Sequence, residues 1–268
     1  MAEQYVQYLR RLLLLLRTVF HLVYLVSDIA TVIHTVVVMV RKTSEPGVSE
    51  RLLDMRDNAP AFLTNWNMAF QGSFLVLAVC ADVLEWSGRT RGRLGGWVIY
   101  LRDVIFCALV LPYAVFLSHS FWAIYWYDRE LVFPRVFDEA LPWWFNHCVH
   151  TNIVVMVALE TLLQARPHPT SRKYEEALFW TVSIVYSAMI YILYLATGHW
   201  LYQIFGVMTW WKTVLFQLYL WFTPYLAYRL QFPLNRLIHG SADAQYYRQC
   251  LDYTQISKQE KQIKEEGL

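Results

Sequence analysis

Polar side chains recur on one face of the apolar run from Ala61 to Trp86, and one of them is a threonine. The residues are Thr64, Asn67, Gln71 and Asp82. At 100° per residue they point within about 60° of one another, so they form one polar stripe along a helix. Such a stripe avoids lipid. It either hydrogen-bonds to neighbouring helices as structural glue or forms part of a functional site.

A second apolar run, from Leu141 to Leu163, carries polar residues near its start. Asn146 and His150 are one helical turn apart on one face, and His147 lies beside them. A lone buried histidine is more often structural than catalytic. Histidine is nevertheless the usual base that takes a proton from a hydroxyl nucleophile, so Thr64 and His150 are of the right kinds to act as a pair.

The elements that must position these residues are membrane helices. Only 16% of the 268 residues are charged, against roughly 25% in soluble proteins, and 57% are hydrophobic. The apolar residues occur in runs of about 20, the length that spans a bilayer as a helix. Six runs are expected to span: Thr18–Val40, Ala61–Trp86, Val98–Trp126, Leu141–Leu163, Leu178–Leu201 and Val207–Tyr228. The last run is the weakest, because Lys212 and Pro224 interrupt it.

The sequence therefore predicts an all-α, multi-pass membrane bundle of about six helices. Residues 1–240 form the transmembrane domain, and residues 241–268 form a charged cytoplasmic tail. Lys and Arg are more numerous in the segments that lie inside when both termini are cytoplasmic, so we expect that orientation. The helices of Thr64 and His150 then enter from the same outer side, which places both residues in the outer half of the bundle.

Several other functions are not expected. The formal net charge of +2 gives no basic excess for binding nucleic acid. The chain has eight histidines but only one HxxH pair, formed by His147 and His150, which is too few for a di-iron membrane oxygenase. No metal or other cofactor is therefore expected. The sequence also contains no paired half-repeats, which would favour a transporter.

Several segments fall in the same order as in one known family. They are Phe62-Leu63-Thr64, Leu101-Arg102-Asp103, Phe121-Trp122, Tyr127-Asp128-Arg129-Glu130 with Pro134, Trp144-Phe145-Asn146-His147 with His150-Thr151, and Thr197-Gly198 with Trp200 and Tyr202. The matching stretch covers about residues 61–202, and its most specific part is the NHxxHT motif beside the YDRE segment. In these segments the chain resembles the androgen-induced and androgen-dependent TFPI-regulating proteins.

This resemblance implies a six-span threonine hydrolase that cleaves fatty acid esters of hydroxy fatty acids. Thr64 would be the nucleophile and His150 its base. Asn67 and Asn146, each one turn from a member of the pair, are candidate oxyanion donors or orienting residues. The substrate would be a lipid ester taken from the bilayer into a largely apolar cavity in the outer half of the bundle. The host membrane would be the endoplasmic reticulum or the plasma membrane.

The alternative is a non-enzymatic, lipid-binding or partner-regulating membrane protein in which the Thr/His cluster only holds helices together. The exact lipid, a third catalytic residue and the oligomeric state leave no trace in the sequence.

Overall fold

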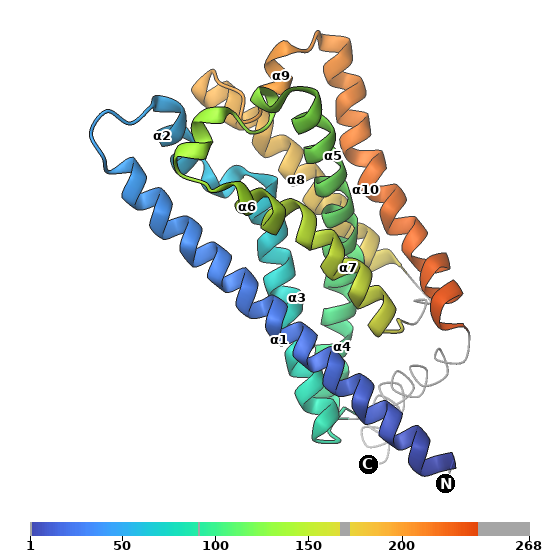
Figure 1. The fold of residues 1–268 in the computed structure, drawn as a ribbon. Coiled ribbons are helices and arrows are strands. Elements are labelled where there is room, and N and C mark those ends of the chain that lie inside the picture. Colours follow the sequence, from blue (N-terminus) through green and yellow to red (C-terminus); the bar gives the residue numbers. More distant parts are fainter. Residues whose placement is uncertain (1, 91, 167–171, 241–268) are drawn as a thin grey trace, which may run out of the picture.

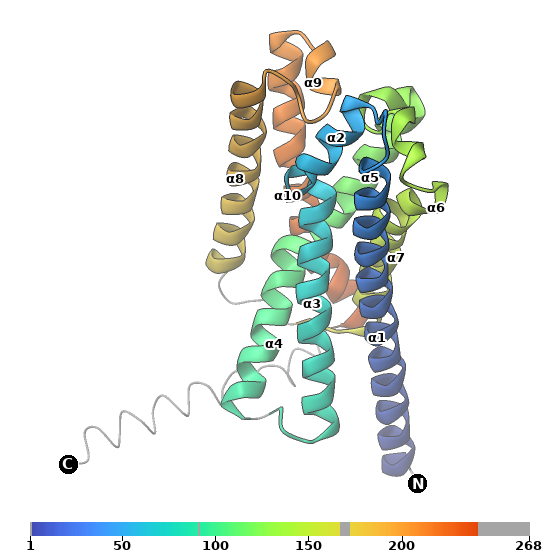
Figure 2. The ribbon, with the colours of Figure 1, turned by 90° about the vertical axis from the view of Figure 1, so that its left-hand side faces the viewer.

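The computed structural model describes residues 2–90, 92–166 and 172–240, and it confirms the all-α fold (Figure 1). The predicted tail 241–268 lies outside the described residues. Six helical rods lie side by side in the described part of the chain (Figures 1 and 2). They are α1 (Ala2–Thr43), α3 (Leu63–Trp86), α4 (Arg93–Ile105) continued by α5 (Leu111–Asp128), α6 (Trp143–Asn146) continued by α7 (Asn152–Leu163), α8 (Lys173–Thr197) and α10 (Trp210–His239).

Short elements connect the rods. The helix α2 (Glu50–Asp57) and the single turn α9 (Ile204–Val207) lie at the end of the bundle opposite the start of α1 (Figures 1 and 2). We call this the far end. The 3-10 turns Ala59–Ala61, Arg129–Leu131 and Arg135–Glu139 complete the connections.

Four of the helical segments are long and apolar enough to cross a membrane. They are Gln4–Thr43, Leu63–Trp86, Arg93–Leu131 and Lys173–Thr197. The α6–α7 rod is interrupted by a π-helical turn, and α10 contains Lys212, Pro224 and Pro233. These two rods correspond to the remaining predicted spans, and α10 is the run that the sequence marks as weakest.

A glycine and a proline cause local departures from the helices that the sequence predicts. The fifth run was expected to reach Leu201, but α8 ends at Thr197 because Gly198 adopts the left-handed conformation, with φ 73°. The α4–α5 rod contains a π-helical turn at Phe106–Val110, just before Pro112. A proline cannot donate the usual helical hydrogen bond, and a π turn absorbs that defect within the helix.

Apolar side chains divide between the bundle interior and its periphery. The interior holds a large cluster that includes Phe74, Phe106 and Phe179, each almost completely buried. In contrast, only 11% of the apolar window of α1 is buried, so most of its Leu, Ile and Val side chains point outward. An outward apolar surface of this kind fits a lipid environment rather than water.

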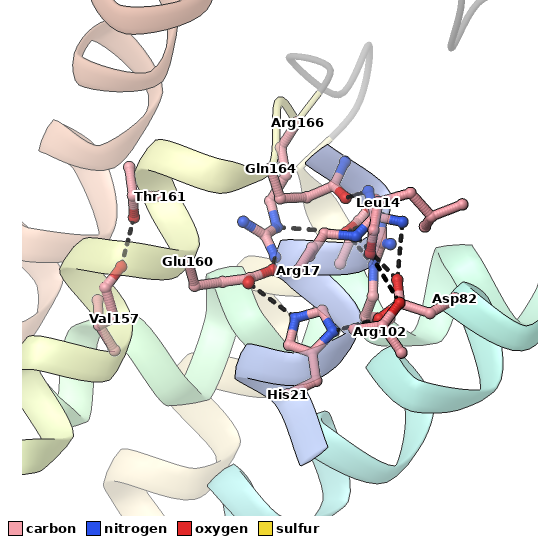
Figure 3. Close-up of polar contacts among 12 residues, drawn as sticks. Leu14, Arg17, His21, Asp82, Arg102, Val157, Glu160, Thr161, Gln164 and Arg166 are labelled. Atoms are coloured by element: carbon pink, nitrogen blue, oxygen red, sulfur yellow. Dashed lines mark hydrogen bonds and ion pairs between the residues drawn. The ribbon is translucent and has the colours of Figure 1, made fainter. Parts of the chain in front are cut away.

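Buried charges join three of the rods (Figure 3). On α1, Arg17 donates to Asp82 of α3 at 2.8 Å, and His21 contacts Asp82 at 2.6 Å through Nδ1. The Nε2 atom of the same ring contacts Glu160 of α7 at 2.9 Å, and Arg166 pairs with Glu160 at 2.5 Å. We call Arg17, His21, Asp82, Glu160 and Arg166 the ion cluster. Each buried charge here meets an opposite charge, as a low-dielectric interior requires.

The polar residues of the first span do not all behave alike. Their spacing of seven residues puts His21, Asp28 and Thr35 on one face of α1 and predicts hydrogen bonds to other helices, and of the three only His21 is shown to make them. Thr35 instead donates to the carbonyl of Thr31 on its own helix at 2.7 Å. Asp28 Oδ2 is buried without a hydrogen-bond partner among the described residues.

Removing Asp82 should destabilise the bundle strongly, because Arg17 and His21 would then be left buried without this carboxylate. We expect Asp82→Ala to cost about 3–5 kcal/mol, the range measured when one partner of a buried ion pair is removed. Thermal unfolding in detergent measures the loss, with the exposed Asp54→Ala as the control. Equal melting temperatures for the two variants would contradict a stabilising role for the ion cluster.

Candidate functional site

A large cavity lies within the bundle. Its volume is about 660 Å³, and its walls come from α1, α2, α3, α5, the α6–α7 rod, α8, α9 and α10. Most of the lining side chains are apolar or aromatic. The polar residues that line it include Thr64, Ser120, Asn146, His150, Tyr186 and Tyr202. Arg56 is the one charged residue among its described lining residues.

Thr64 lies at the beginning of α3, and side-chain hydrogen bonds fix the turn that precedes it. Pro60 lies in the 3-10 turn that leads into α3, and Phe62 is extended, so the chain bends immediately before the helix. Asn65 Nδ2 donates to the carbonyl of Ala59 at 2.5 Å, and Trp66 Nε1 donates to that of Pro60 at 2.8 Å. These side chains hold the first turn of α3 against the preceding loop.

His150 lies in the π-helical turn His147–Thr151 between α6 and α7. Its ring stacks on Phe121 of α5, with the ring centroids 3.5 Å apart and the planes 8° from parallel. The residue is only 4% exposed, and its Nδ1 atom has no hydrogen-bond partner among the described residues. Aromatic stacking, rather than a carboxylate, therefore orients this imidazole. π-Helical turns of this kind occur often at functional sites.

The structure brings three of the four predicted site residues to one cavity. Thr64, Asn146 and His150 all line it, and α3 packs against the π-helical turn that carries His150. Asn146 is buried and its Oδ1 atom is unpaired. Asn67 is completely buried, with neither amide atom bonded to a described residue, but it does not line the cavity.

The comparison with known families agrees with this architecture. The family model described as "FAR-17a/AIG1-like protein" matches residues 58–236, which is more than half of the chain. The chain belongs to the FAR-17a/AIG1-like family. This confirms the resemblance drawn from the motifs and extends it to α10. No solved structure matches the chain.

Curated relatives in the family are moderately similar. Androgen-dependent TFPI-regulating protein of Mesocricetus auratus is 33% identical over 159 residues, which cover 59% of this chain and 67% of the relative. The Homo sapiens protein of the same name is 33% identical over 146 residues, covering 54% and 62%. Androgen-induced gene 1 protein of Homo sapiens is 31% identical over 146 residues, covering 53% and 61%.

Within this family framework, the structure adds site residues that the sequence reasoning missed. Tyr202 belongs to the family-like motifs, but its position there predicts no role. Tyr186 lies within an apolar span and has no distinguishing neighbours in the sequence. Both line the cavity, as does Arg56. Nothing in their spacing distinguishes them from interfacial aromatic and basic residues. The ion cluster lies outside the lining of this cavity.

The histidine pair does not form a metal site in the described residues. His147 Nδ1 contacts Thr151 Oγ1 at 3.2 Å, whereas His150 stacks on Phe121. In the ranges that the structure describes, no group of three or more His, Cys, Asp or Glu side chains is arranged to hold a metal ion.

Filling the cavity should weaken lipid binding. Ile190 of α8 lines the cavity and is 3% exposed, whereas Ile184 of the same helix is 55% exposed. We expect Ile190→Trp to weaken binding of a fluorescent long-chain fatty acid roughly tenfold, about 1.4 kcal/mol, and Ile184→Trp to leave it unchanged. Titration in detergent micelles measures the affinity, and unaltered binding by a folded Ile190→Trp variant would exclude this cavity as the binding site.

Proposed function

We propose that this protein is an intramembrane esterase that hydrolyses fatty acid esters of hydroxy fatty acids. The observation that carries the proposal is that Thr64 and His150, the family-matched nucleophile and base, line one largely apolar cavity. The cavity volume of about 660 Å³ lies within the range typical of small-molecule sites. No cofactor is needed for this chemistry.

The chemical steps require only these two side chains and water. Thr64 Oγ1 attacks the ester carbonyl carbon while His150 takes the hydroxyl proton, and the carbonyl π electrons move onto oxygen. The tetrahedral intermediate then collapses, and the departing alkoxide takes the proton from His150. This leaves an acyl-threonine and a free hydroxy fatty acid. Water, deprotonated by His150, attacks the acyl-threonine and releases the fatty acid, and the proton returns to Thr64.

The surroundings of the pair favour a lipid substrate. Apolar walls exclude a highly charged headgroup, whereas an ester that joins two acyl chains partitions into such a site from the bilayer. With both termini cytoplasmic, as the distribution of Lys and Arg indicates, the far end faces outward and the cavity lies in the outer half of the membrane. The host membrane would be the endoplasmic reticulum or the plasma membrane.

Removal of either reacting group should abolish turnover. We expect Thr64→Ala to reduce hydrolysis of such an ester to background, and His150→Ala to reduce it about 10²–10⁴-fold. Each variant should keep its melting temperature in detergent. Thr35→Ala and His147→Ala are matched controls, because Thr35 lines the same cavity and His147 lies one turn before His150. Release of free fatty acid by purified protein measures the activity.

The same variants separate the enzyme from the non-enzymatic alternative. Full activity in Thr64→Ala or His150→Ala would remove these residues from the mechanism. If the unsubstituted protein shows no turnover and the two variants have lower melting temperatures, the Thr/His cluster only holds helices together. Covalent capture of a fluorophosphonate on Thr64 would support the esterase directly.

Arg56 should bind the free carboxylate of the substrate. It is the one charged residue among the described lining residues, and its side chain, which pairs with Asp57 at 2.8 Å, is 39% exposed and so reaches both the cavity and its surroundings. A guanidinium binds a carboxylate through charge-assisted hydrogen bonds. We expect Arg56→Gln to raise KM several-fold for the free-acid ester but not for its methyl ester. The exposed Arg51→Gln on the same helix is the control, and an equal change in KM for both substrates would contradict this role.

A further inference from the structure

Two tyrosines meet at the start of α3, next to Thr64. Tyr202 lies in the connection after α8, and its hydroxyl oxygen accepts a hydrogen bond from the backbone N–H of Leu63 at 3.0 Å. The hydroxyl of Tyr186, on α8, lies 3.1 Å from that of Tyr202. The rings of Tyr186 and Tyr202 also pack edge-on against Trp66 and Phe62 respectively, the residues two positions on either side of Thr64. Both tyrosines line the cavity.

The tyrosine pair has one O–H donor more than the pair itself can use. Two hydroxyl groups carry two protons, and the bond between them uses one. The Leu63 N–H supplies its own proton, so it consumes none of theirs. Among the described residues, neither hydroxyl has another hydrogen-bond acceptor. Whichever tyrosine donates to the other, one O–H is therefore left over at the cavity wall beside the start of α3.

We propose that the Tyr186–Tyr202 pair donates this remaining proton in a hydrogen bond to the oxyanion that forms when Thr64 attacks the ester. The proposal rests on the proposed esterase function and names the group that stabilises its tetrahedral intermediate. No proton is transferred in this contact. A fixed hydroxyl in an apolar cavity stabilises developing negative charge without reorganising.

The surroundings support a donor at this position. The bond from Leu63 N–H and the packing of both rings fix the two hydroxyl groups before substrate arrives. The start of a helix also favours negative charge, because the amide dipoles point their positive ends there. Asn67, a candidate oxyanion donor by sequence, is buried outside the cavity lining, whereas the tyrosines are part of it.

Either tyrosine hydroxyl alone should be able to donate to the oxyanion. Tyr186→Phe leaves the Tyr202 proton free, and Tyr202→Phe leaves the Tyr186 proton free, so each single variant retains one donor. We expect modest losses of kcat in the single variants and a loss of roughly 10²–10³-fold in the double variant. KM should change little. The loss in the double variant thus exceeds the product of the two single losses.

A control variant separates this role from the general loss of a tyrosine hydroxyl. Tyr191 lies on α8 but outside the cavity lining, and its hydroxyl donates to Gln217 Oε1 at 3.3 Å. Tyr191→Phe should therefore leave kcat close to that of the unsubstituted protein. If the pair only caps α3, Tyr202→Phe alone should lower the melting temperature and kcat as much as the double substitution does. Adding Tyr186→Phe should then change neither quantity further. That result would overturn the proposal.

A binding experiment tests the donor without relying on turnover. In a Thr64→Ala background, a phosphonate monoester with the substrate's two chains mimics the oxyanion, and an ether analogue mimics only the chains. We expect the double tyrosine substitution to weaken phosphonate binding roughly 10²-fold and to leave ether binding unchanged. Equal effects on both ligands, or none, would overturn the donor role. Absence of turnover in the unsubstituted protein would instead contradict the esterase function.

Discussion

Neutralisation of charge inside the bundle is the constraint on which the rest of the structure depends. A lone ionised side chain in a low-dielectric interior is costly, and each member of the ion cluster is stabilised there by contact with an opposite charge. Because His21 contacts a carboxylate at each ring nitrogen, α1 is held to α3 and α7 at once (Figure 3). Sliding any of the three helices by one turn would separate these charges.

The candidate site uses the same helices at a different level. Asp82 lies near the end of α3, whereas Thr64 lies at its beginning; Glu160 lies near the end of α7, whereas His150 immediately precedes that helix. The ion cluster thus fixes the register of the two helices that bring Thr64 and His150 to the cavity. This separation leaves the site free of fixed charge, apart from Arg56 among its described lining residues. Polar groups in the cavity act on one another through an apolar medium, where their interactions are stronger than in water.

Several buried polar atoms without a hydrogen-bond partner lie at the site or beside it, and others occur elsewhere in the described bundle. Asn67, Asn146 and His150 each have a buried polar atom without a partner among the described residues. A buried, unpaired polar group costs free energy, so its presence is more easily understood at a site that binds something than in a purely structural core. The Tyr186–Tyr202 pair belongs to the same pattern, because its two hydroxyl groups hold one proton more than their neighbours accept.

The sequence by itself determined the fold class, the six helical rods and the two residues proposed to react. Apolar runs of helical length need no tertiary information, because a membrane-spanning segment must satisfy its own backbone hydrogen bonds. Thr64 and His150 stood out because polar residues are rare in such runs, and the motifs around them resemble a family that the comparisons confirm. The spacing of His21, Asp28 and Thr35 also puts them on one face of the first span, without indicating which partners that face would meet.

Only the tertiary structure decided the partners. His21 meets residues 61 and 139 positions away, and Tyr202 caps Leu63 from 139 positions away. Periodicity gives the face of a helix on which a residue lies, but not the neighbouring helix that this face meets. Tyr186 and Arg56 were missed for this reason, since an aromatic residue in a span and an arginine between two spans are unremarkable until packing places them on a common cavity. The local backbone also moved one helix end, because Gly198 terminates α8 at Thr197, four residues before the predicted end at Leu201.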